Sequence, residues 1–271
     1  MKTNFTPQEL DFTKNILEFF QSDRVGEGIA KLEEFKTNLH NAIPQKERIS
    51  KGITFVLKRI SSLIVFVNPE IIKDIAIKIQ QNVKTDNMIF GVAIFLMGEY
   101  GKSHPTEVYQ FFLEAASSGD WVTKEFAQSG FRYVIKPNKD EVYSFLLENS
   151  KSDKSDIRRF VGETLRPVVE NNWMFKNPDY SLSILKNMFR EKKDFPRTSV
   201  GNNLSDLSRK LPDLILGVVK DLVGMEDKNS YWIAYRACRN LVKQFPLKVM
   251  DILKVDEYHY KDRNFYRKDF L

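Results

Sequence analysis

Basic side chains concentrate in one part of this 271-residue chain, where they could bind a negatively charged polymer. Residues 186–210 hold seven lysines and arginines against three acidic residues, a local net charge of +4. The whole chain carries only +6, a balance that on its own need do no more than aid solubility. The uneven distribution therefore indicates residues 186–210 as a contact region for a polyanion.

Two adjacent arginines, Arg158 and Arg159, stand where a helix is expected to begin. Cations at a helix N-terminus oppose the helix dipole, so this pair favours an anionic partner or a neighbouring carboxylate. Asp156, just ahead of the pair, is expected to cap the helix and is one candidate for that neighbour.

Cysteine and metal chemistry are disfavoured by the composition. Cys238 is the only cysteine, which rules out an internal disulfide and a cysteine-rich zinc site. Its apolar helical setting predicts a buried thiol and not a nucleophile. The three histidines, His40, His104 and His259, are scattered and show no metal-ligand spacing. We therefore expect no metal site.

Targeting signals are not evident. The N-terminus reads MKTNFTPQEL and contains no secretory signal. The longest apolar stretch, SLIVFV at 62–67, is too short to span a bilayer. The expected location is the cytoplasm, without a membrane partner.

Four similar phrases in the second half of the chain are the main structural signal. They are EFAQSGFRYV from Glu125, RFVGETLRPV from Arg159, SVGNNLSDLS from Ser199 and RACRNLVKQF from Arg236, and their starts lie 34, 40 and 37 residues apart. Each phrase follows a predicted helix and a polar turn. A period of about 35–45 residues with two helices per unit is typical of HEAT- or armadillo-like repeats. We therefore predict an all-α helical-repeat solenoid with a concave binding face.

Helical patterns also fill the first hundred residues. Thr6 and Pro7 predict a capped helix start. The run ITFVLKRISSLIVFV is rich in β-branched residues, but the long polar-flanked pattern around it favours a helix over a strand. The helices are expected over residues 7–21, 25–40, 45–67, 69–82 and 86–100.

One continuous domain over 1–271 is expected, because no linker rich in proline, glycine or serine interrupts the chain. Residues 1–100 form divergent N-terminal helices and residues 101–255 form the clearer repeats. The tail, 256–271, is charged and aromatic without clear periodicity. It either packs across the last repeat as a cap or stays partly loose.

Several segments of the repeats resemble a known family. They are IRRFVGETLRPVVENNW, SVGNNLSDLSRKLPDLIL, YWIAYRACRNLVKQFP and KEFAQSGFRYVI. These segments look like the HEAT-like-repeat alkylpurine DNA glycosylases, and more like the AlkC branch than the AlkD branch. The resemblance spans about residues 100–250, whereas residues 1–100 agree only in helical character.

The resemblance implies a monofunctional DNA glycosylase, a hydrolase of DNA repair, with alkylated duplex DNA as its partner. Members of this family bind duplex DNA on the concave face and release cationic N3-alkylated bases such as 3-methyladenine, without a metal or organic cofactor. Such a base leaves readily, so the remaining task is to stabilise a cationic sugar and to place water. A carboxylate in a dry site does both, and a tryptophan face adds roughly 0.5–2 kcal/mol of cation–π attraction. We expect a monomer.

The resemblance also implies roles for individual residues. Glu163 and Asp206 match acidic positions of the family and would stabilise the sugar cation and hold water, with Glu125 in support. Trp121, one helical turn before Glu125, and Trp173 would pack against sugar or base. The DNA-binding set is expected to comprise Arg158, Arg159, Arg166, Lys192, Lys193, Arg197, Asn202 and Asn203.

Structural roles are the alternative for the same side chains. Helical glutamates are commonly solvated or paired, so Glu163 could pair with Arg159 one turn earlier, and Asp206 could pair with Arg209. Asn202 and Asn203 could cap a turn, and Trp121 and Trp173 could cap repeats. The chain would then be a non-catalytic HEAT-like module that binds DNA or a protein along the same face.

A departure from the AlkD pattern concerns the last repeat. The AlkD branch has a further tryptophan there, whereas the matching helix of this chain reads RACRNLVKQF. Trp232 lies upstream, and the sequence leaves open whether it compensates for the missing tryptophan. This departure favours the AlkC branch.

Overall fold

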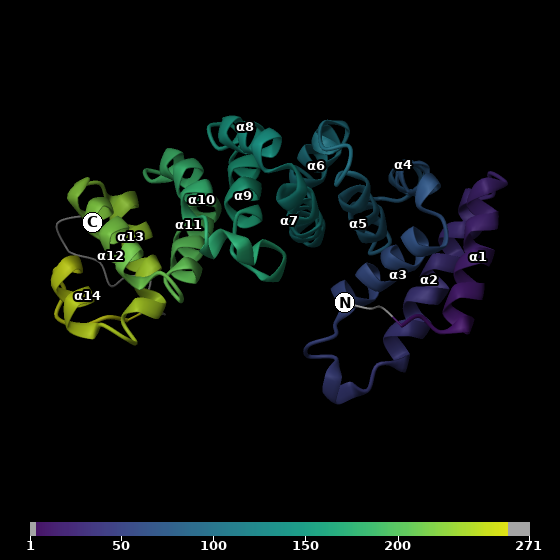
Figure 1. The fold of residues 1–271 in the computed structure, drawn as a ribbon, viewed down its shortest axis with the longest axis horizontal. Helices are drawn as coiled ribbons and strands as arrows, with labels where there is room; N and C mark the ends of the chain where they lie inside the picture. The colour runs from purple at the N-terminus through teal and green to yellow at the C-terminus, as the bar shows by residue number, and fades with distance from the viewer. Residues whose placement is uncertain (1–3, 260–271) are drawn as a thin grey trace. The chain divides into compact units, whose positions relative to one another are not determined.

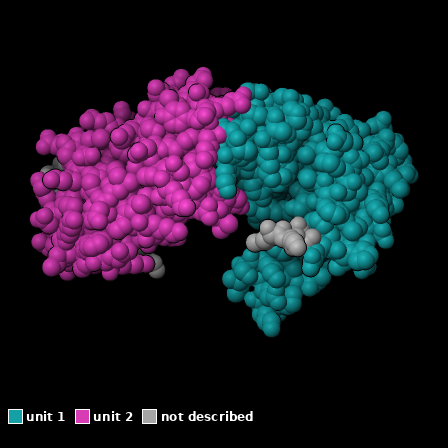
Figure 2. Space-filling view, in the orientation of Figure 1, with its two compact units in different colours: residues 1–138 teal, residues 139–271 magenta. Residues whose placement is uncertain are grey.

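The computed structural model describes residues 4–259, and within that range the chain forms fourteen α-helices and no strand (Figure 1). The predicted all-α class is confirmed. The contacts of the chain group it into two compact units, unit 1 (Met1–Asn138) and unit 2 (Lys139–Leu271) (Figure 2). A single continuous domain over 1–271 stays a prediction. Most of the tail, residues 260–271, lies outside the described residues.

Unit 1 contains seven α-helices among its described residues. They are α1 (Pro7–Gln21), α2 (Val25–Ala42), α3 (Ile53–Val67), α4 (Ile72–Asn82), α5 (Phe90–Tyr100), α6 (Tyr109–Ala116) and α7 (Trp121–Ile135). In this unit α1 packs on α2, α4 packs on α5, and α6 packs on α7, while α5 also lies against α3 and α7. Its core is built from fully buried aliphatic and aromatic side chains such as Leu57, Ile75 and Phe131.

Local sequence explains most helix starts of unit 1. Thr6 and Glu9 form the capping box that opens α1, with Pro7 in the first turn, as predicted. The helix predicted over 45–67 is wrong in its first part. A short 3-10 turn (Gln45–Glu47) comes first, and α3 begins only after Gly52, whose extended backbone breaks the helix. The helix predicted over 86–100 begins at Phe90, because the side chain of Asn87 accepts from the Ile89 N–H and holds a turn.

The helices of unit 2 follow one another in pairs, and each pair consists of a first helix and a second helix. Its helices are α8 (Lys139–Asn149), α9 (Ser155–Thr164), α10 (Pro178–Leu185), α11 (Asp194–Leu207), α12 (Pro212–Gly224), α13 (Lys228–Leu241) and α14 (Pro246–Leu253). The four repeated phrases fall on α7, α9, α11 and α13, the second helices of successive pairs. In unit 2, α11 lies against both α9 and α13.

Small residues let these second helices approach closely. A Cβ atom added at Gly162 would lie 3.0 Å from Cβ of Ser199, and one added at Gly201 would lie 2.9 Å from Cβ of Arg236. Asn203 reinforces the contact, since its Nδ2 donates to the Gly162 carbonyl at 3.1 Å. Within unit 2, the repeat period thus reflects the packing of α9 on α11 and of α11 on α13.

Two further expectations can be compared with the structure. Cys238 is fully buried as predicted, and its burial raises the pKa of the thiol. Asp156 does not cap α9: the N-cap is Lys154, and Asp156 lies in the first turn, where its charge still complements the helix dipole. Across the described residues, no helix is long and apolar enough to cross a membrane.

The close approach at Gly201 predicts opposite effects of alanine at two helical glycines of unit 2. Gly201→Ala should destabilise the protein by about 1–3 kcal/mol, because its methyl group would overlap the Cβ of Arg236. Gly217→Ala in α12, where nothing lies within 4 Å of the added atom, should stabilise it by roughly 0.5–1 kcal/mol. Chemical denaturation of both variants measures the difference. Equal shifts would contradict the packing described above.

Candidate functional site

Two buried carboxylates from successive repeats share one arginine. Glu163 lies near the C-terminal end of α9 and Asp206 near that of α11, and only 6% and 5% of these residues are exposed. Arg166 donates through Nη1 to Oε2 of Glu163 at 3.2 Å. Its Nε and Nη2 donate to Oδ2 of Asp206 at 2.8 and 2.6 Å. The structure therefore brings together two of the three acidic residues that the sequence singled out.

Asp206 is surrounded by positive charge. Besides Arg166, Nη2 of Arg209 lies 3.1 Å and Nη2 of Arg239 lies 3.6 Å from its Oδ1. The pairing of Asp206 with Arg209, which the sequence left open, is confirmed. Three guanidinium groups around one carboxylate neutralise its field, whereas Glu163 shares Arg166 through one longer hydrogen bond. Arg166 thus forms shorter hydrogen bonds with Asp206 than with Glu163.

The environment keeps Arg166 charged. Burial by itself lowers its pKa, but the charges of Glu163 and Asp206 and the hydrogen bonds with both outweigh burial, and the net shift is upward. This guanidinium binds two carboxylates in the folded chain. Its predicted role as a phosphate ligand therefore competes with a structural one.

Asparagine side chains fix the surrounding backbone. Nδ2 of Asn171 donates to the carbonyl of Thr164 at 2.8 Å, at the end of α9. Asn203 ties α11 to α9, and Asn202 accepts from Nε of Arg236 at 2.9 Å. Neither Asn202 nor Asn203 caps a turn, because both lie inside α11 and bond to neighbouring helices.

Trp173 packs within unit 2. It lies in a 3-10 segment (Val169–Phe175) and is 9% exposed. Nζ of Lys139 lies 4.5 Å from the centroid of the Trp173 ring system. The Tyr180 ring packs edge-on against Trp173, with 5.0 Å between the two ring centroids. The hydroxyl of Tyr180 donates to the Lys139 carbonyl at 2.9 Å and so holds the two together. The ammonium group of Lys139 therefore already lies over the ring of Trp173.

Trp121 and Glu125 lie in unit 1. Trp121 is the first residue of α7, directly after the capping residue Asp120, and is 47% exposed. Glu125 follows one helical turn later, is half-buried and accepts a hydrogen bond from Gln128. The predicted common face of Trp121 and Glu125 agrees with their positions on α7.

The predicted DNA-binding arginines are mostly engaged within the protein. Arg158 forms an ion pair with buried Glu191 and donates to the Ser152 carbonyl at 2.7 Å. Arg159 is 6% exposed. Arg197 donates to Asn229 at 2.6 Å and to Asp194. By contrast, Lys192 and Lys193 are exposed in the segment that precedes α11.

Sequence reasoning missed the packing of arginine on Trp232. The guanidinium carbon of Arg197 lies 4.8 Å and that of Arg236 lies 5.5 Å from the centroid of the Trp232 ring system. Arg239, beside Asp206, was also missed, although it occurs in the fourth repeated phrase. A basic residue inside such a phrase is the signal that could have identified it.

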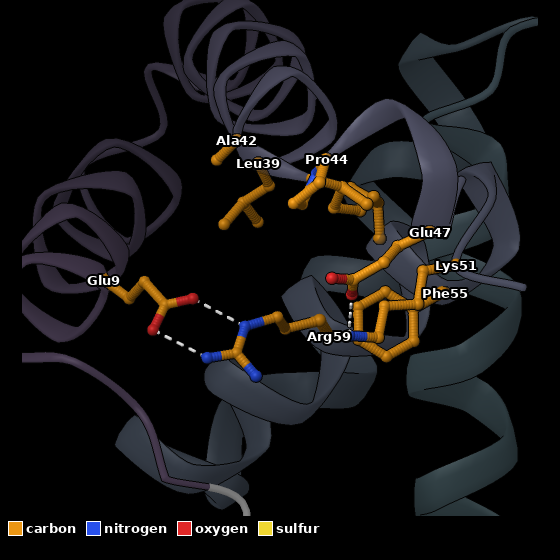
Figure 3. A pocket seen from close by; sticks show the side chains of 10 residues that line it. Glu9, Leu39, Ala42, Pro44, Glu47, Lys51, Phe55 and Arg59 are labelled. Carbon is orange, nitrogen blue, oxygen red and sulfur yellow. Dashed lines mark hydrogen bonds and ion pairs between the residues drawn. The ribbon is translucent and has the colours of Figure 1, made fainter.

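A cavity of about 310 Å³ lies in unit 1, between α1, the end of α2 and α3 (Figure 3). Leu39, Pro44 and Phe55 contribute its apolar wall. Arg59 binds Glu9 through two hydrogen bonds, and Lys51 pairs with Glu47 at 2.6 Å, so both charge pairs on its rim are satisfied (Figure 3). None of the predicted site residues lines this cavity. In the described part of the chain, no group of three or more potential ligands could hold a metal ion.

Solved structures similar to this chain place it in a known fold class. AlkD2 from Streptococcus mutans superposes with a TM-score of 0.57 over 77% of this chain and 98% of that one, at 20% identity. The alkylpurine DNA glycosylase AlkC from Pseudomonas fluorescens, bound to DNA containing an abasic site analog, superposes with a TM-score of 0.53 over 88% and 67%, at 18% identity. The chain therefore has the helical-repeat fold seen in AlkD2 and AlkC. The resemblance inferred from the repeats is thereby confirmed for the fold.

Sequence comparison adds one relative. The uncharacterized protein YhaZ from Bacillus subtilis (strain 168) is 26% identical in an alignment of 161 residues. This alignment covers 57% of this chain. The match spans only 43% of YhaZ, less than half of that protein. No family model matches the chain.

The buried pair of Arg158 and Glu191 predicts an acid-sensitive contribution to stability. Burial alone raises the pKa of Glu191, but the hydrogen bonds from Arg158 and from the Lys193 N–H outweigh it and lower the pKa below its ordinary value. The contribution is therefore complete above the ordinary glutamate pKa and is lost as the pH falls through the lowered one.

Glu191→Gln should lower the free energy of unfolding at neutral pH by about 1–3 kcal/mol, since it leaves the half-buried Arg158 without its carboxylate. The variant should also lose part of the stability change that the wild type shows between pH 7 and pH 3. Denaturant titrations at several pH values measure both effects, and exposed Glu148→Gln in α8 is the control. A wild-type pH dependence that persists in full in Glu191→Gln would rule out this assignment.

Proposed function

We propose that this protein binds duplex DNA and releases cationic N3-alkylated bases such as 3-methyladenine by hydrolysing the N-glycosidic bond. The observation that carries the proposal is the pair of buried carboxylates, Glu163 and Asp206, which come from successive repeats and share Arg166. The fold supports the proposal, since AlkC with the same fold was solved bound to DNA containing an abasic site analog.

The chemistry requires little more than a positioned negative charge. An N3-alkylated purine is cationic and leaves without a general acid, so the barrier lies in the positive charge that develops on the deoxyribose. A preorganised carboxylate in a dry site stabilises that charge and can orient a water molecule. We assign this role to Glu163 of unit 2. Asp206, neutralised by three arginines, would act by holding Arg166 in place.

The tryptophans differ in what they can offer a substrate. Trp121 is 47% exposed and can pack against sugar or base, whereas Trp173 is 9% exposed and already has Lys139 near its ring. In unit 2 we therefore propose Trp173 as the aromatic contact, one that requires Lys139 to move. We propose the exposed Trp121 as a separate aromatic contact to DNA made by unit 1. Exposed Lys192 and Lys193 are proposed to contact phosphates.

A non-catalytic DNA- or protein-binding module is the competing function, and one observation favours it. Both Glu163 and Asp206 are held in ion pairs, which is a common structural use of buried carboxylates. The two functions differ in whether base release depends on the charge of Glu163.

Binding and base release provide the first test of the proposal. The affinity for duplex DNA should fall linearly with salt concentration on a logarithmic scale, because lysine contacts with phosphates release counterions. Purified protein should release 3-methyladenine from methylated duplex DNA, with or without a chelator. Duplex binding without release above the spontaneous rate would favour the non-catalytic module, and no binding at low salt would favour a protein partner.

The second test removes one charge. Glu163→Gln should slow single-turnover base release by roughly 10²-fold, about 2.7 kcal/mol, because the lost charge acts mainly in the transition state. DNA affinity should hold or rise slightly, since a negative charge near the polyanion is removed. Rapid-quench base release, fluorescence anisotropy and the melting temperature separate these effects, with Glu148→Gln as the control. A fall in activity that only tracks a fall in stability would leave Glu163 a structural role.

A further inference from the structure

We propose that unit 2 carries a binding site for an unpaired nucleotide of single-stranded DNA at the N-terminal ends of α11 and α13. The proposal rests on the proposed DNA binding and adds a DNA structure that the protein would prefer. The site is a basic–aromatic patch, comprising Arg190, Lys192, Lys193, Phe195, Arg197 and Trp232.

The central feature of the basic–aromatic patch is an exposed aromatic ring. Phe195 is the second residue of α11 and is 60% exposed, although phenylalanine normally lies in the core. Exposed Lys192 and Lys193 come shortly before it in the chain, separated from it by Asp194, which pairs with Arg197. An exposed ring beside lysines is the combination with which proteins bind single strands, because the ring stacks on a base and the cations contact the backbone.

Trp232 keeps the neighbouring cations in place. Its ring system lies 4.8 Å from the guanidinium carbon of Arg197 and 5.5 Å from that of Arg236. Arg197 also donates to Asn229 of α13 at 2.6 Å, and this contact shows that the N-terminal parts of α11 and α13 are adjacent (Figure 1). Trp232 is therefore a positioning residue, while Phe195 would contact the base.

The charges near the basic–aromatic patch favour an anion. The patch has four cationic side chains, those of Arg190, Lys192, Lys193 and Arg197, and two acidic neighbours. Asp194 pairs with Arg197, and the charge of Arg190 acts on Asp227. Glu191 is already bound by Arg158. The N-terminus of α11 has no side-chain cap and adds the positive end of its dipole.

The choice of a single strand follows from geometry. In duplex DNA both faces of each base are covered by its neighbours, so an aromatic side chain can stack only on an unpaired or displaced base. Lysine contacts with phosphates do not distinguish the two forms. A preference for unpaired DNA that depends on Phe195, and not on the lysines, is therefore the property that identifies this site.

The experiment measures the affinity of the full chain for a fluorescent oligothymidylate and for an unmodified duplex of equal length. Phe195→Ala should weaken oligothymidylate binding roughly tenfold or more and leave its salt dependence unchanged, because stacking releases no counterions. Leu247→Ala, which removes a 78% exposed apolar side chain from α14 of the same unit, should leave the affinity unchanged. Duplex affinity should change little in either variant.

The lysines provide the complementary comparison. Lys192→Gln combined with Lys193→Gln should weaken binding to both oligonucleotides and reduce the salt slope for the single strand by roughly 0.7 per lost phosphate contact. Lys220→Gln in α12, an exposed lysine of the same unit, is the control. A slope equal to that of the control would overturn the electrostatic part of the site.

The outcomes separate this proposal from the glycosylase proposal. Equal affinities of Phe195→Ala and Leu247→Ala for oligothymidylate would overturn the nucleotide site, whatever the base-release assay shows. Phe195-dependent oligothymidylate binding without base release from methylated duplex would support the site and reject the glycosylase. Since Phe195 is exposed, melting curves should show that both variants remain folded at the assay temperature.

Discussion

Unit 2 depends on the close approach of its second helices, α9, α11 and α13. Gly162 and Gly201 leave room for Ser199 and Arg236 of the following repeat, because any larger side chain would overlap them. Once the helices are in contact, side chains that are 33 to 41 residues apart in sequence meet across the junction, as Arg166 meets Asp206 and Arg158 meets Glu191. The hydrogen bonds and ion pairs between repeats therefore recur with nearly the period of the repeat.

Some charges at the ends of α9 and α11 are ones that the helix dipole disfavours. Glu163 and Asp206 lie near C-terminal ends, where carboxylates are unfavourable, and Lys192 and Lys193 lie at an N-terminal end, where cations are unfavourable. Ion pairs with arginines offset this unfavourable electrostatic energy at Glu163 and Asp206. Local rules of this kind are broken mainly where function requires it, and this supports assigning chemistry to one end and nucleic-acid contact to the other.

Burial of the ion pairs links stability to the proposed chemistry. Arg166 satisfies two carboxylates at once, so each carboxylate limits how strongly the arginine binds the other. Asp206 holds the two shorter hydrogen bonds and lies beside two further guanidinium groups. Glu163 and Asp206 are thus both buried beside one guanidinium, and removing Arg166 would leave both carboxylates without this shared partner.

The sequence by itself determined the helical class, the repeat period and the residues worth examining, because the periodicity of apolar side chains and the caps act locally. The Thr6 cap, α3 in place of a strand and the buried Cys238 all follow from neighbours in the chain. Only the tertiary structure decided that Arg158 binds Glu191, that Arg166 joins two carboxylates and that Phe195 stays exposed. These outcomes depend on which side chains meet when separate repeats pack, and no local pattern encodes the pairing of residues some 40 positions apart.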